Sequence, residues 1–208
     1  MFPIIPANSA TGASGNSEGI FGFGSGPTNV TNLVSNTGVV SSDVAGVGTA
    51  RQTLAACEYG GDKGIFGFGL YYSPTTYTAI TNLVSNTGVV ASDQAATTGT
   101  GRGFLAACSY GGDKGIFGYG TTGSIVSITN LVSNTGVVAS DQAATTGTGR
   151  SYIAATQYGG DKGIFGFGYT GSVRVSITNL VSNTGVVASD QAATTGTGRH
   201  GPAACSFN

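Results

Sequence analysis

Two sets of charged residues recur along this sequence, and their types could support chemistry. Each arginine of the first set precedes a short apolar run, and each aspartate of the second set follows another. The arginines are Arg51, Arg102, Arg150 and Arg199, and the aspartates are Asp43, Asp93, Asp141 and Asp190. Arginines gathered around an axis would bind an anion, whereas arginines that pair with nearby carboxylates or loop carbonyls would be structural. Both interpretations stay open, and the structural one is favoured.

Catalytic groups are scarce. The sequence holds one histidine, His200, which belongs to no repeated phrase. A hydrolase that works at a central axis is an alternative, but no G-x-S-x-G nucleophile phrase is present. No helical pattern follows the phrase GIFGFG, so it offers no helix N-terminus to a phosphate. We expect the protein not to be an enzyme and to need no cofactor.

The three cysteines share one context. Cys57, Cys108 and Cys205 each close the phrase AAC, and the remaining copy of the phrase has Thr156 instead. An odd number of cysteines and a threonine replacement argue against a disulfide framework. The short Cys or His spacing of a zinc site is absent. These positions therefore predict small buried side chains and no metal.

Internal repetition dominates the sequence. GIFG begins at Gly19, Gly64, Gly115 and Gly163, with steps of 45, 51 and 48 residues. The 23 residues 80–102 recur unchanged at 128–150 and at 177–199. A period near 48 suits a four-stranded propeller blade.

Each repeat predicts four strands joined by tight turns. In the third repeat the strands are expected at 105–111, 114–120, 126–132 and 137–143. Gly-Gly-Asp and Ser-Asn-Thr-Gly supply the turns, because glycine and asparagine tolerate the backbone angles that tight turns need. No helical period persists, so the predicted fold class is all-β.

The first repeat begins at its second strand, and the chain ends with a lone first strand. If Pro202–Phe207 pairs with Gly19–Gly24, the two ends complete one blade and close a ring that protects its sheet edges. The prediction is a four-bladed β-propeller over 15–208, preceded by an attachment segment at 1–14. Its blades are expected at 15–51 with 199–208, at 52–102, at 103–150 and at 151–198.

The repeats resemble kelch repeats. Arg102, LAACSYGGDKGIFGYG at 105–120 and SITNLVSNTGVVASD at 127–141 follow the kelch order. The chain departs from that pattern because its glycines alternate, the tryptophan is missing, and four blades are fewer than usual. The resemblance implies a kelch-like propeller closed by a C-terminal first strand, with partners bound through its loops.

A second resemblance lies at the N-terminus. FPIIPANSA at Phe2–Ala10 is similar to the opening of structural proteins from marine tailed bacteriophages, especially those infecting cyanobacteria, and the NLVSNTGVVASD repeats look like others from such phages. This resemblance implies a virion protein of the tail fibre or head surface, assembled in the host cytoplasm and attached to other virion proteins through 1–14. A leader without consequence is the alternative.

The copies differ in two places: after GIFG[FY]G and just after the arginine. An up-and-down blade brings both places to one side and the invariant turns to the other. The candidate binding residues on the variable side are Tyr71, Tyr72, Tyr77, Tyr152, Tyr169, Arg174 and His200. Aromatic and polar side chains suit a host-surface glycan or protein, although neutral variation in unconstrained loops explains the differences equally well.

Composition excludes two classes of partner. Charged residues make up 8% of the chain and the net charge is −1, so a basic stripe for nucleic acid is missing. No apolar run approaches the ~20 residues that cross a bilayer. We expect a non-enzymatic virion structural protein for host adhesion or particle decoration, compatible with a homo-oligomer. A lectin-like or scaffolding propeller unrelated to a virus is the alternative.

Overall fold

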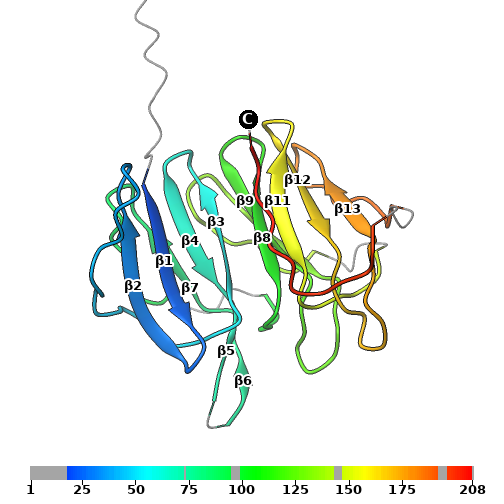
Figure 1. Ribbon diagram of the computed structural model, residues 1–208, viewed down its shortest axis with the longest axis horizontal. Helices are drawn as coiled ribbons and strands as arrows, with labels where there is room; N and C mark the ends of the chain where they lie inside the picture. Colours follow the sequence, from blue (N-terminus) through cyan, green and yellow to red (C-terminus); the bar gives the residue numbers. More distant parts are fainter. Residues whose placement is uncertain (1–17, 73, 95–98, 143–146, 192–195, 208) are drawn as a thin grey trace, which may run out of the picture.

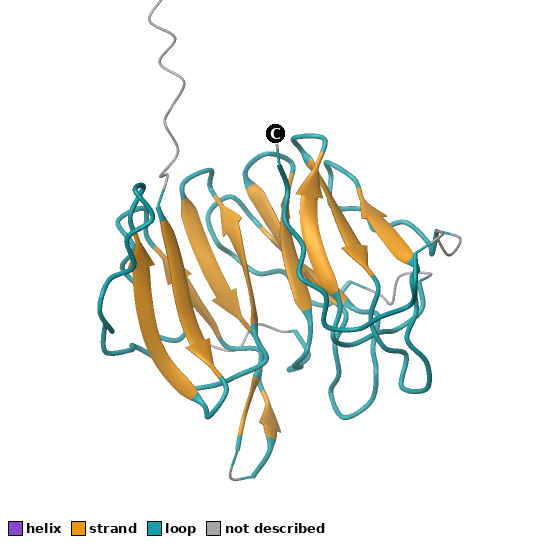
Figure 2. Cartoon of the chain, in the orientation of Figure 1, coloured by secondary structure: helices purple, strands orange, loops and turns teal. Residues whose placement is uncertain are grey.

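The computed structural model describes residues 18–72, 74–94, 99–142, 147–191 and 196–207. The expected attachment segment at 1–14 lies outside these residues. Within them the chain forms only strands and loops, and all strand pairs are antiparallel, which confirms the predicted all-β class (Figure 2). The strands are β1 Gly19–Gly24, β2 Thr28–Val34, β3 Ala55–Tyr59, β4 Lys63–Gly67, β5 Leu70–Tyr71, β6 Thr76–Tyr77, β7 Thr81–Val84, β8 Ala106–Tyr110, β9 Lys114–Gly118, β10 Thr129–Val132, β11 Ala154–Tyr158, β12 Lys162–Gly166 and β13 Thr178–Val181.

The strands form five small sheets that follow the sequence repeat. Three of them have the same order of first, second and third strand: β3-β4-β7, β8-β9-β10 and β11-β12-β13. The register is also repeated, since Cys57 lies opposite Ile65 and Cys108 lies opposite Ile116. The first repeat contributes β1 and β2 alone, and the hairpin β5-β6 makes the fifth sheet. We call the repeats units 1 to 4, which hold the described residues of 18–51, 52–102, 103–150 and 151–198, and we call 199–207 the C-terminal segment.

The predicted fourth strand of each unit is reduced to isolated contacts. In unit 3, Val138 bridges to Val132 and Gln142 bridges to Thr129. Between them, the side-chain amide of Asn130 donates to the Ala139 carbonyl over 3.0 Å. A side chain therefore takes a position that a strand would fill with backbone hydrogen bonds, which interrupts the ladder.

Successive units pack face to face, with β3 beside β8 and β8 beside β11 (Figure 1). At each junction a phenylalanine ring of one unit lies against a glycine of the unit before it. The pairs are Gly22 with Phe66, Gly67 with Phe117 and Gly118 with Phe165, where a Cβ on the glycine would lie 2.9, 2.6 and 2.6 Å from ring carbon Cζ. Phe117 and Phe165 are fully buried, and each buried ring contributes about 1.5–3 kcal/mol by area. Aromatic residues thus fill the space between units.

The two chain ends do not pair in this structure. β1 pairs only with β2 among the described strands, and residues 201–207 form no strand. Instead, Pro202 and Ala204 line a pocket with Ala154 of β11, and the C-terminal segment runs beside β11 at some distance from β1 (Figure 1). The expected pairing of 202–207 with β1 is therefore corrected for this chain.

A backbone ladder explains where the C-terminal segment goes. The amide of Phe104 donates to the Thr53 carbonyl, and the amide of Tyr152 donates to the Phe104 carbonyl. The amide of Gly201 continues the series by donating to the Tyr152 carbonyl over 2.7 Å. This hydrogen bond places residues 202–207 on the outer side of β11. That is the position that the first strand of a further unit would take.

The cysteines differ more than the sequence predicts. All three are free thiols, but Cys108 is buried, Cys57 is half-buried and Cys205 is exposed. Burial raises the pKa of Cys108 to about 12 and raises the pKa of Cys57 as well. A thiol that is not ionised is a poor nucleophile.

We expect a thiol reagent to modify one cysteine rapidly in the dilute native protein and three in the unfolded protein. Cys205 is the fast one because it is exposed. Absorbance with a chromogenic disulfide reagent, followed by peptide mass mapping, measures the number and the position. Rapid modification of Cys108 in the native protein would contradict the burial described here.

Candidate functional site

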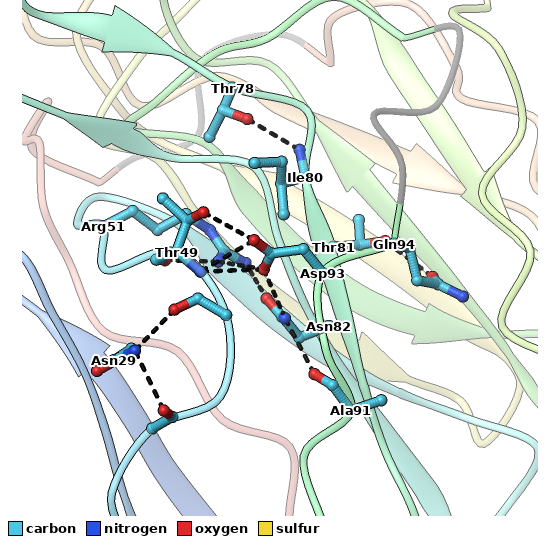
Figure 3. A network of polar contacts seen from close by, with 12 residues as sticks. Asn29, Thr49, Arg51, Thr78, Ile80, Thr81, Asn82, Ala91, Asp93 and Gln94 are labelled. Carbon is cyan, nitrogen blue, oxygen red and sulfur yellow. Dashed lines mark hydrogen bonds and ion pairs between the residues drawn. The ribbon is translucent and has the colours of Figure 1, made fainter.

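The repeated arginines lie at the junctions between units. Arg51 is fully buried, and its guanidinium stacks 4.3 Å from the ring centroid of Phe23 in unit 1. It then reaches into unit 2, where Nε donates to the Phe68 carbonyl over 2.7 Å and Nη2 donates to Asn82 Oδ1 over 2.7 Å. The guanidinium thus joins two units through a ring, a carbonyl and an amide. Figure 3 shows Arg51 beside Asn82, Asp93 and Thr49.

The ring and asparagine contacts return at the next two junctions, and the Nε–carbonyl bond returns at Arg102 but not, among the described residues, at Arg150. Arg102 stacks on Phe68 and donates to Asn130, and Arg150 stacks on Tyr119 and donates to Asn179. Both arginines are fully buried. The ion pairs with Asp93, Asp141 and Asp190 are long, at 4.0, 3.9 and 3.5 Å. The three arginines therefore act as clamps between units, and burial lowers the pKa of Arg51 and of Arg102 to about 10.

The aspartates orient the rest of the clamp. Asp93 accepts a hydrogen bond from Asn82 over 2.9 Å, and it accepts the Thr49 hydroxyl from the preceding unit over 2.7 Å. Thr100 and Thr148 bind Asp141 and Asp190 in the same way. Partial burial would raise the pKa of these carboxyls, but the hydrogen bonds from threonine and asparagine outweigh it and leave the pKa lowered.

We expect the free energy of unfolding to be level near neutral pH and to fall below about pH 4, the ordinary range of aspartate. A carboxyl whose folded pKa is lowered stabilises the fold above its unfolded pKa, and this contribution is lost as the pH falls through the folded pKa. The turn aspartates Asp62, Asp113 and Asp161 act in the same direction, because hydrogen bonds from the adjacent lysines lower their pKa.

Urea denaturation between pH 7 and pH 2.5 measures this dependence. The Asp93→Asn variant removes one titrating carboxyl and should flatten the acid limb. An unfolding midpoint that is the same at pH 3 as at pH 7 would contradict the clamp as described.

Sequence reasoning missed the asparagine and threonine of the clamp. The signal was present, since TNLV and GT[AG]R recur once per repeat. Nothing in the sequence indicated that the stacked aromatic residues have a positive φ. This angle lies between 62° and 65° at Phe23, Phe68, Tyr119 and Phe167. Positive φ is unfavourable for a bulky residue, and at Phe68 it accompanies both a ring beneath Arg102 and a carbonyl bonded to Arg51.

The variable segments of each unit meet at one end of the sheets. Gln52 bridges to Leu70, Gly103 bridges to Thr121 and Ser151 bridges to Tyr169. At the opposite end the invariant turns bind each other, since the side-chain amides of Asn86, Asn134 and Asn183 donate to Asp62, Asp113 and Asp161, each over 3.1 Å. The predicted division into a variable end and an invariant end is therefore present. We define the variable end as the described residues of 25–30, 52–54, 70–79, 103–105, 121–127, 151–153, 169–176 and 200–202.

Four of the seven candidate residues gather at unit 4 and the start of the C-terminal segment. The ring of Tyr152 lies 5.6 Å from His200, and that of Tyr169 lies 6.0 Å from the same histidine. Arg174 Nε donates to His200 Nδ1 over 2.8 Å. Phe104 extends the group, with its ring centroid 4.3 Å from that of Tyr152. Tyr152 is 41% exposed, so the cluster presents an aromatic surface to solvent.

The other three candidates lie on the hairpin β5-β6. Tyr71 and Tyr77 belong to its two strands, and Tyr72 is 55% exposed. The hydroxyl of Tyr72 accepts a hydrogen bond from Gln52 Nε2 over 2.7 Å. The Tyr77 ring lies beside Gly103, since a Cβ on that glycine would be 3.5 Å from Tyr77 Cε1. The hairpin is thus tied to unit 3 and projects from the units (Figure 1).

The chemistry of His200 is set by its arginine neighbour. In a Ser-His-Asp arrangement, histidine Nδ1–H donates to a carboxylate. Here Nδ1 accepts from the Arg174 guanidinium instead. Among the described residues there is no group of three or more metal-ligating side chains and no helix of the length and apolarity that spans a membrane.

Comparisons with known proteins give no family for this chain. No family model matches it, and no curated protein is significantly similar to it. The resemblances to kelch repeats and to phage structural proteins therefore rest on the sequence phrases alone.

Proposed function

We propose that the chain is a non-enzymatic structural protein of a phage virion, displayed on a tail fibre or on the capsid surface. The observation that carries this proposal is the contrast between its two ends. Invariant turns and buried clamps form a rigid framework, while the differences between copies gather at the variable end. Binding surfaces are commonly carried by loops on such a scaffold.

The proposed arrangement is a four-bladed kelch-like propeller. Its support is that the first strands β3, β8 and β11 lie side by side, with aromatic rings between successive units. Completing the split first blade needs a first strand on the free edge of β1, which the chain's own residues 202–207 do not occupy in this structure. The attachment segment proposed at 1–14 would bind a neighbouring virion protein.

The variable end is proposed to contact a host-surface glycan or protein. Tyr72 and Tyr152 are exposed, and His200 lies beside Arg174. Aromatic faces and polar side chains at one surface suit sugar rings and their hydroxyl groups. The same binding surface is proposed for the alternative, a lectin-like propeller that does not belong to a virus.

Two experiments test the proposal. Mass spectrometry of purified particles should find the polypeptide, and its absence from particles would remove the virion assignment. Glycan-array binding should be lost in the double variant Tyr71→Ala and Tyr72→Ala. The matched control is Val137→Ala, which changes an exposed residue of unit 3 outside the variable end. Equal binding by both variants would contradict adhesion through the hairpin.

A further inference from the structure

The two ends of the row of units carry the two halves of one junction. Phe21 is 64% exposed, although its counterparts in the other units, Phe66, Phe117 and Phe165, are at most 5% exposed. At the other end, Gly166 is the counterpart of Gly67 and Gly118. Among the described residues, the nearest atom to a Cβ on Gly166 would be Thr178 Cγ2 at 3.3 Å, and none of their aromatic rings lies within 4 Å. In the described part of the chain, Phe21, which has no glycine packed against its ring, and Gly166, which has no ring packed against it, therefore lie at opposite ends of the row of units.

The polar clamp is divided in the same way. Arg199 stacks 3.9 Å from the Phe167 centroid but is exposed. Within the described residues the only hydrogen bond from its guanidinium goes to the nearby Thr197 carbonyl over 3.3 Å. In unit 1, Asn32 donates to Asp43 over 2.9 Å, as the equivalent pairs do in the other units. In the part of the chain that the structure describes, these two residues have no arginine or threonine partner of the kind that Asn82 and Asp93 have.

A groove marks where a strand is missing. It has a volume of about 350 Å³ and lies between Gly19 and Ile20 of β1 and Cys57 and Gly64 of unit 2. At the complete junctions, the corresponding glycines Gly115 and Gly163 meet the sulfur atoms of Cys57 and Cys108. At Gly64 the atoms of the described residues nearest to an added Cβ are Val84 Cβ and Cγ2, at 3.6 and 3.7 Å, and the Cys57 carbonyl oxygen at 3.9 Å, with no cysteine sulfur among them. The repeat phrase that ends in Cys205 therefore matches the groove.

We propose that a second copy of the chain fills this groove, so that molecules associate end to end. Residues 202–207 of one copy pair with β1 of the next, and Phe21 of that next copy packs on Gly166. The register of the complete units places Cys205 opposite Ile20, as Cys57 lies opposite Ile65. Arg199 then reaches Asn32, and Thr197 reaches Asp43.

A second copy is the occupant because the chain's own segment is held elsewhere. The Gly201 amide donates a hydrogen bond to the Tyr152 carbonyl, and Pro202 and Ala204 lie against β11. This is the end of the row of units opposite to β1. In that position, residues 203–207 are exposed. An interface between two different surfaces of one molecule continues into longer assemblies or closes into a ring of copies. The inference rests on the proposed kelch-like arrangement of units and is independent of the virion assignment.

Two exposed positions allow a mixing experiment. Phe21→Ala disables the β1 end, and Arg199→Glu disables the C-terminal end by placing a carboxylate opposite Asp43. Because both side chains are exposed in the single chain, neither variant should lower its stability by much. Loss of the buried ring is expected to weaken association by about a hundredfold. Light scattering coupled to gel filtration measures the mass against the 20.5 kDa chain.

The expected results distinguish a second copy from the chain's own segment. The wild-type chain forms species of two or more copies, each variant alone stays a monomer, and the mixture forms a dimer of one copy of each. Cys205 becomes protected from thiol reagents as the wild type associates. The exposed-site variant Tyr72→Ala should associate like the wild type. A wild-type monomer at all concentrations, an assembly that both variants leave intact, or a mixture that stays monomeric would each overturn the proposal.

Discussion

Replacing Arg102 with alanine is expected to lower the free energy of unfolding by about 3–5 kcal/mol, because it breaks a buried charged network. The guanidinium is fully buried and donates to the Tyr119 carbonyl, the Thr100 carbonyl and Asn130. Its removal leaves these acceptors inside the junction without a donor, in addition to a cavity over Phe68. Urea denaturation followed by circular dichroism measures the loss.

The repeat supplies the matched control. Arg199 stacks on Phe167 as Arg102 stacks on Phe68, but it is exposed. Arg199→Ala, measured at a concentration where the chain is a monomer, should cost about 0.5 kcal/mol or less. Equal losses for the two variants would show that the arginine stabilises its own loop and not the junction between units.

Replacing Gly118 with alanine is expected to cost about 1–3 kcal/mol through overpacking. The added Cβ would lie 2.6 Å from Cζ and 2.9 Å from Cε1 of Phe165. That ring is fully buried between units 3 and 4, so it has no free space to move into. The shift of the urea midpoint reports the cost.

Gly166→Ala is the control at the open end. A Cβ there would lie 3.3 Å from Thr178 Cγ2 and meets nothing closer, so a loss below about 0.5 kcal/mol is expected. A neutral Gly118→Ala variant would mean that Phe165 does not press on Gly118. The same Gly166→Ala change should weaken the end-to-end association proposed above.

The strands and turns could be predicted from the sequence because they depend on residues that are close together in the chain. Alternation at 114–118 and the Gly-Gly-Asp turn are local features, and the register of β8 and β9 follows from them. The division into variable and invariant ends could also be predicted, because an antiparallel hairpin returns the chain to the same end. Local patterns fixed these features without knowledge of packing.

Contacts between units were not predictable in the same way. Asn130 and Thr100 look like ordinary strand and loop residues, and their roles depend on a buried guanidinium that bridges two units. The destination of 202–207 was also missed, since the phrase AAC fits two edges equally well. One is the free edge of β1, and the other is the outer side of β11. Which of them it occupies depends on the hydrogen bond from Gly201 to Tyr152, which no local pattern specifies.

The most direct test is the disulfide that an Ile20→Cys variant forms under mild oxidation. The register of the complete units places residue 20 opposite Cys205, while Cys108 is buried and Cys57 is half-buried. The account predicts that residues 20 and 205 link between chains, which gives multiples of 20.5 kDa on a non-reducing gel. A single species of 20.5 kDa, in which peptide mapping finds residues 20 and 205 joined within one chain, would contradict it.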